Sequence, residues 1–570
     1  MNRIWQVAYP PGVPAEIDVN KYASINAMLS RACRRFAGRP AFTNFGVSMT
    51  YAEVDRLSRN FAAWLQNLPG LPKGSRIALM MPNLMQYPIA LFGALRAGMI
   101  VVNVNPLYTA RELENQLHDS GTKGIVILEN FAHVLQGVLP RTAVEFVVTT
   151  RIGDLFPPNK RRLANFVVKR VKKMVPAWRI DRAIAFRTAL HCGARAKWDE
   201  PALTHDDIAF LQYTGGTTGV SKGAVLTHGN IVANVLQGSA WTSTVMVDGR
   251  DTMVTALPLY HIFSLTTNCL LCMEKGGNNL LITNPRDMRS FVKQLRKSRF
   301  TVITGVNTLF NSLLNTPGFA ACDFSGLKIA LGGGAAIQRV VAERWRQVTG
   351  HPIVQGYGLT ETSPFVACNL FTNEYDGTVG PPVPSTEVCI LDAEDREVAV
   401  GLEGEICVRG PQVMKGYWQR PEETENAFTA GGWLRTGDIG LVDERGFLHI
   451  TDRKKDMILV SGFNVYPNEV ESVIAGHPGV AECAVIGVPD PVSGEAVKAF
   501  IVRKDPELAP ESVVAFCRQG LTNYKVPRQI EFRGDLPKNQ VGKVLRRELR
   551  PAPNENTDLD SARRCAKGTI

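Results

Sequence analysis

From about residue 20 onward, segments with helical periodicity alternate with short runs of apolar and β-branched residues. The periodicity predicts helices over 51–66 and 87–96. The short apolar runs predict strands, at 76–81, 124–128, 146–149, 209–213, 254–257, 279–283, 302–305 and 328–332. Strands that alternate with helices in this way predict a parallel sheet covered by helices. Glycine-rich loops follow several of these strands, where the ligands of open α/β sheets usually bind.

From about residue 385 the pattern becomes richer in strands and turns, and predicted strands lie at 387–391, 404–409, 439–442 and 447–451. A further α+β unit has strand candidates at 481–488 and 497–502. We therefore predict the fold class α/β, with a large N-terminal domain of α/β subdomains and a β-rich subdomain, plus a small α+β C-terminal domain. The predicted boundaries are 1–451 for the large domain, 452–456 for a hinge, 457–550 for the small domain and 551–570 for a disordered tail.

Composition agrees with several subdomains. The chain has 570 residues, of which 45% are hydrophobic and 21% charged, and no apolar run reaches the length that spans a bilayer. The amino terminus lacks the apolar core of a secretory signal, so we expect a cytoplasmic protein. Eleven cysteines in apolar contexts predict buried thiols rather than disulfides. Core packing is also the favoured interpretation of Cys269 and Cys272, although a CxxC pair is compatible with redox or zinc chemistry.

The net charge of +11 is partly concentrated in one segment. Within 160–179 eight lysines and arginines accompany an apolar stripe at helical spacing, formed by Leu163, Val167, Val171, Met174 and Trp178. This pattern predicts peripheral association with the inner face of the membrane, and an ordinary amphipathic surface helix is the alternative. The stripe is aliphatic and lacks a stacking platform of interleaved aromatics, so no nucleic-acid partner is expected.

The segment 213–223, Tyr-Thr-Gly-Gly-Thr-Thr-Gly-Val-Ser-Lys-Gly, combines glycines, hydroxyls and one lysine. Glycines allow close approach of the backbone, and hydroxyl and ammonium groups bind phosphate oxygens, so the composition favours an anion site. Val220 and Ser221 separate the last internal glycine from Lys222, which excludes a Walker A motif. A glycine-rich surface turn is the alternative for this segment taken alone.

Three later segments favour the anion site. They are Gln-Gly-Tyr-Gly-Leu-Thr-Glu at 355–361, a block from Gly431 through Asp438 to Pro467, and Leu-Pro-Lys-Asn-Gln-Val-Gly-Lys-Val-Leu-Arg at 536–546. In kind, order and spacing these blocks resemble those of the adenylate-forming enzymes, which include acyl-CoA synthetases, peptide-synthetase adenylation domains and luciferases. Within that superfamily the chain is most similar to bacterial long-chain fatty-acid-CoA ligases. The resemblance extends from about Tyr22 to about Arg550.

The resemblance implies an ATP-dependent enzyme that joins a fatty acid to CoA through an acyl-adenylate, with ATP and CoA as co-substrates and Mg2+ as cofactor. The β- and γ-phosphates would be held by Thr214, Gly215, Gly216, Thr217, Thr218, Gly219 and Lys222. Adenine would be bracketed by Gly333, Gly334, Ala335, Gln355, Gly356 and Tyr357. Thr360 would also belong to the nucleotide-binding residues. Glu361 and Thr214 would bind Mg2+ through hard oxygen ligands.

The same resemblance assigns the remaining roles. Asp438 would accept hydrogen bonds from the ribose with help from Arg453, and Lys455 would approach the phosphate, although its neighbour Lys454 could take that role. Lys543 would contact the α-phosphate and the carboxylate during adenylation, and His261 would position the carboxylate. A mobile C-terminal domain would rotate about Asp452 between the half-reactions, and Gly462 would form part of the CoA tunnel. The charged stretch that begins at Asp452 predicts an exposed linker, which suits a hinge. No cysteine nucleophile is needed.

The identity of the acid is the least determined part. The apolar side chains expected around the acyl group are Ile262, Phe263, Leu265, Val306 and Leu309. They suit an alkyl chain, and they also suit an aromatic acid. Leu265 stands where some long-chain members carry a gating tryptophan. The alternatives are a medium-chain or aryl-acid CoA ligase, a fatty-acyl-AMP ligase serving a carrier protein, and a noncatalytic nucleotide- or membrane-binding protein. A homodimer is retained as a candidate assembly.

Overall fold

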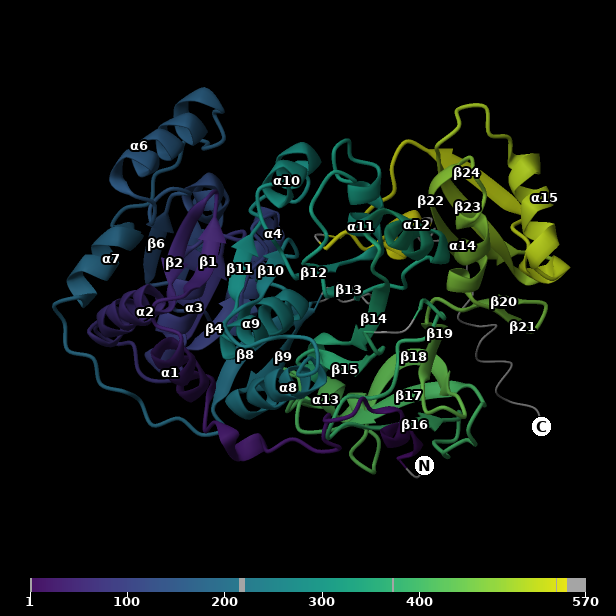
Figure 1. The fold of residues 1–570 in the computed structure, drawn as a ribbon, viewed down its shortest axis with the longest axis horizontal. Helices are drawn as coiled ribbons and strands as arrows, with labels where there is room; N and C mark the ends of the chain where they lie inside the picture. The colour runs from purple at the N-terminus through teal and green to yellow at the C-terminus, as the bar shows by residue number, and fades with distance from the viewer. Residues whose placement is uncertain (1–2, 215–220, 372–373, 540, 551–570) are drawn as a thin grey trace. The chain divides into compact units, whose positions relative to one another are not determined.

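The structure, a computed structural model, describes residues 3–214, 221–371, 374–539 and 541–550. The chain divides into two compact units (Figure 1). The large unit contains the residues up to Lys455 together with 540–543, and the small unit contains 456–539 and the chain from Val544 onward. The predicted hinge, 452–456, spans this division.

Within the described residues, one sheet of the large unit has seven strands in the order β7-β6-β5-β3-β4-β8-β9. Neighbours pair in parallel, except β8 and β9, which are antiparallel. The central strands are continuous apolar runs, as parallel strands buried on both faces require. The strands are β3 (Arg76–Met80), β4 (Ile100–Asn103), β5 (Gly124–Leu128), β6 (Phe146–Thr150), β7 (Ile184–Ala185), β8 (Ile208–Thr214) and β9 (Lys222–Thr227).

A second sheet of the large unit has eight described strands in the order β15-β14-β13-β12-β10-β11-β1-β2. Its inner pairs are parallel, and only the pairs at the two edges are antiparallel. The strands are β1 (Pro40–Asn44), β2 (Val47–Thr50), β10 (Thr252–Thr255), β11 (Asn278–Leu281), β12 (Val302–Gly305), β13 (Ile329–Gly332), β14 (Ile353–Gly358) and β15 (Phe365–Cys368).

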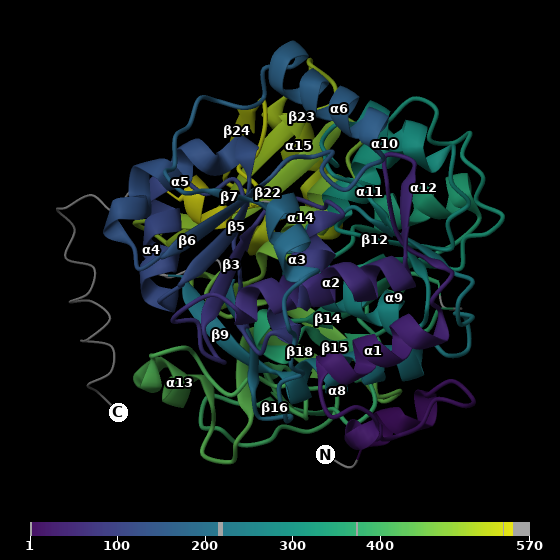
Figure 2. The same cartoon turned by 90° about the vertical axis from the view of Figure 1, so that its left-hand side faces the viewer.

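Helices α2, α3 and α8 lie between these two sheets (Figures 1 and 2). Helix α2 (Tyr51–Gln66) contacts β1 and β2, while α3 (Gln86–Arg96) contacts β3 and β4 and is buried along its whole length. Helix α8 (His228–Trp241) contacts β9 and β15. Its start is fixed by a capping box, in which the Thr227 hydroxyl accepts from the Asn230 backbone and the Asn230 side chain accepts from the Thr227 backbone.

Helices α1 (Ile25–Arg35) and α9 (Leu271–Glu274) pack against α8 and against each other, and α13 (Pro421–Ala427) contacts β18 of the β-rich subdomain. The other described helices of the large unit are α4 (Ala110–Ser120), α5 (Ala132–Val138), α6 (Pro158–Phe166), α7 (Phe186–Gly193), α10 (Met288–Leu295), α11 (Asn307–Leu314) and α12 (Arg339–Thr349). Two π-helical segments, η5 (Val167–Val171) and η6 (Ser264–Leu270), and the 3-10 turn η7 (Thr360–Thr362) also matter for the site.

The β-rich subdomain and the small unit each have a sheet of their own. The former is antiparallel, in the order β16 (Glu387–Leu391), β17 (Gly404–Arg409), β18 (Leu434–Val442) and β19 (Leu448–Arg453). In the small unit, helices α14 (Pro467–Ala475) and α15 (Pro510–Gly520) accompany a five-stranded sheet within the described residues. Its strands are β20 (Ile458–Val460), β21 (Phe463–Val465), β22 (Val480–Asp490), β23 (Gly494–Arg503) and β24 (Gln529–Arg533).

These elements confirm the predicted α/β class and most predicted strands. The helix expected over 51–66 and the strands at 124–128, 302–305, 387–391 and 404–409 have the observed bounds. The ten cysteines within the described residues are free, and all but Cys192 are buried. No helix among those residues combines the length and the apolar composition needed to cross a bilayer.

Candidate active site

Two loops at the carboxyl ends of β13 and β14 form the centre of the candidate site. Gly333, directly after β13, donates its N–H to the Gly305 carbonyl at 3.1 Å. A Cβ on Gly333 would lie 3.1 Å from the Gly356 carbonyl oxygen and 3.2 Å from the Phe263 ring. Glycine therefore permits the close approach of these two predicted adenine-binding segments.

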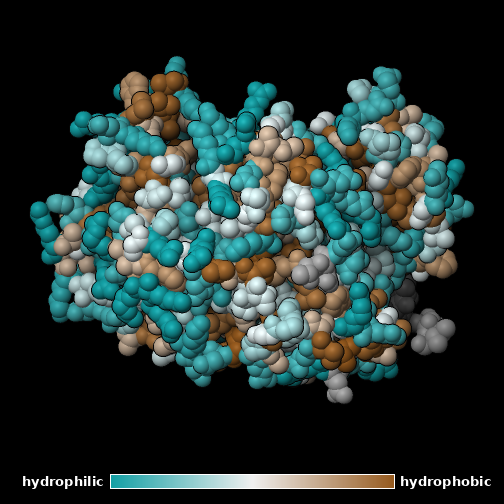
Figure 3. Space-filling view, in the orientation of Figure 1, coloured by the Kyte–Doolittle hydropathy of each residue, from teal (hydrophilic) through white to brown (hydrophobic). Residues whose placement is uncertain are grey.

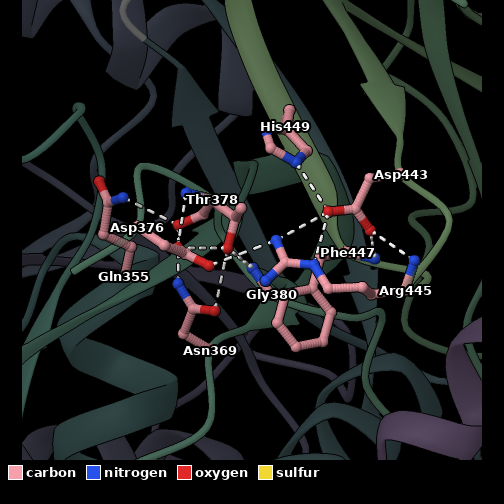
Figure 4. Close-up of polar contacts among 9 residues, drawn as sticks. All are labelled: Gln355, Asn369, Asp376, Thr378, Gly380, Asp443, Arg445, Phe447 and His449. Carbon is pink, nitrogen blue, oxygen red and sulfur yellow. Dashed lines mark hydrogen bonds and ion pairs between the residues drawn. The ribbon is translucent and has the colours of Figure 1, made fainter. Parts of the chain in front are cut away.

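Both polar atoms of the Gln355 side chain make hydrogen bonds to the protein backbone. Its Oε1 accepts from Ile337 N–H at 2.9 Å, and its Nε2 donates to the Thr378 carbonyl at 2.8 Å. Figure 4 shows Thr378 at the centre of a network that continues through Asp376 to Arg445 and Asp443. A direct contribution of Gln355 to adenine binding would therefore come from its backbone.

Asp438, the predicted ribose acceptor, lies in β18 and is buried between two donors. Tyr357 Oη donates to its Oδ2 at 2.6 Å, and Arg453 Nε donates to its Oδ1 at 2.7 Å. Because β18 and β19 pair Asp438 with Arg453, the strand register itself brings the two residues together. The structure thus joins three residues that the sequence analysis assigned to one nucleotide site.

Glu361 lies in η7, which packs against β8 and β9, the strands that carry Thr214 and Lys222. Its Oε1 accepts from Tyr417 Oη at 2.8 Å. The described residues contain no group of three or more histidine, cysteine or acidic side chains that could hold a metal. One carboxylate and one hydroxyl fit a Mg2+ ion that arrives with a polyphosphate, because Mg2+ keeps several waters and takes few protein ligands.

The sequence analysis did not identify Tyr417 as a site residue, although it contacts both Glu361 and Lys222, the predicted phosphate ligand. The Lys222 ammonium is 5.2 Å from the centroid of the Tyr417 ring. The signal in the sequence is an aromatic pair, Tyr417 and Trp418, directly after Gly416 in a segment without helical periodicity.

His261 is kept neutral by its surroundings. Burial, assisted by the positive charge of Lys543, lowers its pKa to about 4. Its Nδ1 accepts the Phe263 N–H at 3.3 Å, so the proton of the neutral ring is assigned to Nε2. Such an imidazole can donate a hydrogen bond to a carboxylate. Lys543 follows Gly542, whose carbonyl accepts from Thr308 Oγ1 at 3.0 Å within the large unit.

A small apolar cavity of about 30 Å³, room for about one water molecule, lies between α8 and the second sheet. Its walls include Leu331, two residues before Gly333, and Phe365. Each of two neighbouring strands contributes two lining residues, Val302 and Thr304 from β12 and Ile329 and Leu331 from β13. The two residues of each pair are two positions apart, so the lining extends along the strands for about 7 Å. None of the five side chains expected around the acyl group lines this cavity. Phe263 packs against the cluster of buried apolar residues that contains Leu331. Leu265 belongs to a different buried cluster.

The predicted hinge differs from expectation at its first residue. The sequence predicted a charged, exposed linker, whereas Asp452 is 1% exposed because it lies in β19 and pairs with Ile439 of β18. Lys454 and Lys455 are exposed. Lys454 Nζ contacts Glu405 Oε2 at 2.9 Å. Gly462 joins β20 to β21 in the small unit, with φ of +84° and open space where a side chain would begin.

The basic segment 160–179 is less helical than predicted. Helix α6 ends at Phe166, η5 follows to Val171, and Lys173 has φ of +50°, so Met174 and Trp178 lie beyond the helix. Trp178 instead packs against the core of the first sheet. Four large apolar side chains are exposed around α6, and Figure 3 shows apolar surface there. They are Leu163, Phe166, Val171 and Met174.

Several predicted residues fall outside the described part of the chain. Within the glycine loop these are Gly215, Gly216, Thr217, Thr218 and Gly219, and the tail 551–570 also lies outside it. Thr214 and Lys222 are described at the two ends of that loop, in β8 and β9. Thr360 lies in η7 beside Glu361, and Ala335 in the loop after Gly334.

Comparison with known proteins identifies relatives over nearly the whole chain. A family model of the AMP-binding enzymes matches residues 29–418, and one of the AMP-binding enzyme C-terminal domain matches 469–543. A long-chain-fatty-acid–CoA ligase of Escherichia coli O157:H7 is 57% identical over 98% of this chain and 100% of its own length. The Bacillus subtilis (strain 168) protein of the same name is 38% identical over 97% and 98% of the two chains.

Solved structures agree with the fold. A fatty acyl CoA synthetase of Mycobacterium tuberculosis has a TM-score of 0.67 at 30% identity and covers 93% of this chain and 98% of its own. ATP-bound MatB from Rhodopseudomonas palustris has a TM-score of 0.78 at 29% identity and covers 92% and 98%. The division into a large and a small α/β unit is thus a known architecture.

Proposed function

The chain belongs to the AMP-binding enzyme family, and on that basis we propose that it is a long-chain-fatty-acid–CoA ligase. It would convert ATP, a fatty acid and CoA into acyl-CoA, AMP and pyrophosphate. The observation that carries the choice of acid is the 57% identity, over 98% of this chain, to a long-chain-fatty-acid–CoA ligase. The apolar walls beside the nucleotide loops suit an alkyl chain. The relatives named long-chain-fatty-acid–CoA ligase support the same substrate class.

In the first half-reaction a carboxylate oxygen attacks the α-phosphorus of ATP and pyrophosphate leaves. Both reactants are anions, so positioning and charge neutralisation account for most of the catalysis. His261 would donate from Nε2 to one carboxylate oxygen, and Lys543 would neutralise charge on the α-phosphate and the carboxylate. Asp438 would hold the ribose, while Thr214, Lys222 and Lys455 would hold the phosphates. Bound Mg2+ would supply further charge neutralisation, with Glu361 and Thr214 as its protein ligands.

In the second half-reaction the CoA sulfur attacks the acyl carbonyl, AMP leaves, and the thiol proton is released. Because AMP is already a good leaving group, no covalent enzyme intermediate is required. Asp452 as the hinge and Gly462 in the CoA tunnel complete the proposal. The homodimer is also kept as a proposal, which sedimentation velocity would test.

The cavity makes a specific prediction for chain length. Gly238 of α8 lines it, and a Cβ there would lie 3.2 Å from Leu271 Cδ2, which also lines it. We expect Gly238→Val to lower kcat/KM for oleate by roughly tenfold or more while octanoate is retained, since pocket methylenes change discrimination by this order. A panel of acids scored by pyrophosphate release measures the shift.

The matched control for this substitution is Gly137→Val. Gly137 is also helical but exposed in α5, with open space where a side chain would begin. Its variant should keep the wild-type order of acids. An unchanged preference for oleate in Gly238→Val would contradict the assignment of this cavity to the acyl chain.

We also propose that residues 160–179 bind the inner face of the membrane, where the fatty acid partitions. The exposed apolar side chains around α6 would enter the interface, and the neighbouring basic residues would attract anionic lipid. Reversing four of these charges to glutamate should reduce co-sedimentation with phosphatidylglycerol vesicles by at least roughly tenfold. The four residues are Lys169, Arg170, Lys172 and Lys173.

A matched control reverses another exposed group of four basic residues. These residues are Lys293, Arg296, Lys297 and Arg299. Among the described residues, no large apolar side chain between Val247 and Val340 in the sequence is exposed. That variant has the same net charge and should retain binding to phosphatidylglycerol vesicles. Equal loss of binding in both variants would mean that net charge, and not the 160–179 surface, determines the association.

A further inference from the structure

The segment 414–420, between β17 and α13, connects two parts of the candidate site (Figure 1). At one end, Met414 N–H donates to the Glu361 carbonyl at 2.8 Å. In the middle, the segment pairs with β9, since Val225 N–H donates to the Gly416 carbonyl at 2.9 Å and Trp418 N–H donates to the Gly223 carbonyl at 2.8 Å. The backbone of Tyr417 is thereby fixed between the turn that carries Glu361 and the strand that begins with Lys222.

The far end of the segment is anchored as well. Arg420 contacts Asp119 of α4 at 2.6 Å, and Tyr213 of β8 donates its hydroxyl to the other oxygen of the same carboxylate at 2.6 Å. The Tyr417 N–H itself donates to Thr424 Oγ1 at 2.9 Å. These contacts restrict the backbone at Tyr417 on both sides.

The Tyr417 side chain then makes two functional contacts with one ring. Its hydroxyl donates to Glu361 Oε1 at 2.8 Å, and its face lies 5.2 Å from the Lys222 ammonium. A tyrosine phenol is protonated in the physiological pH range, so the hydroxyl is a hydrogen-bond donor to the carboxylate. The ring face attracts the lysine cation.

We propose that Tyr417 is a positioning residue that orients the Glu361 carboxylate toward the metal of the metal–ATP complex and holds Lys222 beside it. This role rests on the proposed ATP-dependent function, and it adds a residue that touches neither reacting group. A carboxylate ligand needs a partner that fixes its orientation, and loss of such a partner typically weakens metal binding by roughly 10- to 100-fold. Tyr417 supplies that partner to Glu361 from a segment 56 residues away in sequence.

The test uses Mn2+ and a nonhydrolysable ATP analogue with the full-length protein. Free Mn2+ is measured by electron paramagnetic resonance, and binding of the metal-free analogue by calorimetry. Tyr417→Phe retains the ring and the backbone contacts but loses the hydroxyl. We expect it to weaken Mn2+ binding in the ternary complex by roughly tenfold and to leave metal-free analogue binding unchanged. Tyr417→Leu, which also removes the ring, should weaken metal-free binding by roughly threefold.

Tyr22→Phe is the matched control, because Tyr22 Oη also donates to a carboxylate, Glu274 Oε1, at 3.1 Å. It should change neither measurement. Mn2+ affinity of Tyr417→Phe within about twofold of wild type would overturn the role toward Glu361, and unchanged metal-free binding in Tyr417→Leu would overturn the role toward Lys222. Neither measurement uses an acid or CoA, so the results do not depend on whether the proposed fatty-acid substrate is correct. That substrate is tested by the product analysis with oleate.

Discussion

Replacing Lys543 with alanine is expected to abolish acyl-adenylate formation while thioester formation from supplied acyl-AMP continues. Attack of one anion on another requires a cation at the developing charge, and removal of one preorganised group of this kind typically costs roughly 10²- to 10³-fold in rate. Residues 541–543 belong to the large unit, and the Gly542 carbonyl accepts a hydrogen bond from Thr308 Oγ1. The positive charge of Lys543 contributes to the lowered pKa of His261.

The two half-reactions are measured separately. Pyrophosphate release reports adenylation, and conversion of synthetic oleoyl-AMP and CoA to oleoyl-CoA reports thioester formation. Lys538→Ala is the matched control, because Lys538 belongs to the same final block but pairs with Glu482 at 2.6 Å in the small unit. It should retain both half-reactions. Equal loss of both half-reactions in Lys543→Ala would refute a role confined to adenylation.

Replacing Asp438 with asparagine is expected to lower kcat/KM for ATP by roughly a hundredfold. A hydrogen bond to a charged group contributes about 1.5–3 kcal/mol, and the substitution removes the charge that the ribose hydroxyls would meet. It also removes the carboxylate charge that Arg453 contacts at 2.7 Å. The effect should fall on ATP binding and much less on the KM for oleate.

Asp251→Asn controls for the loss of a buried carboxylate. Asp251 is 2% exposed and pairs with Lys328 at 2.8 Å, but it stands just before β10, at the opposite end of the strands from the nucleotide loops. Its variant should lose stability without a change in KM for ATP. Comparable ATP kinetics in Asp438→Asn and wild type would remove Asp438 from the nucleotide site.

Much of the fold could be predicted because its strands are locally encoded. The central strands of parallel sheets are short apolar runs, so the strands at 124–128 and 302–305 are predicted with their observed bounds. Strand β18 is predicted only in part, since the expected strand begins at Ile439 whereas the observed one begins at Leu434. Its first half, which includes Asp438, carries glycine and charged residues that obscure the strand pattern.

The contacts between distant segments could not be derived from local pattern. The hydrogen bond from Tyr417 to Glu361 depends on how 414–420 pairs with β9, and no periodicity indicates that pairing. The same holds for the cavity, whose walls come from α8, η6, β12 and β13 and include none of the five side chains expected around the acyl group. The charged neighbours of Asp452 predict exposure, but pairing with β18 buries it.

The most direct test of the account is product analysis of the purified wild-type protein with ATP, Mg2+, CoA and oleate. We predict equal amounts of AMP and oleoyl-CoA, and no AMP when oleate is omitted. Accumulation of oleoyl-AMP without oleoyl-CoA would indicate an acyl-AMP ligase for another acceptor. Absence of AMP release with any long-chain acid would contradict the proposed function itself.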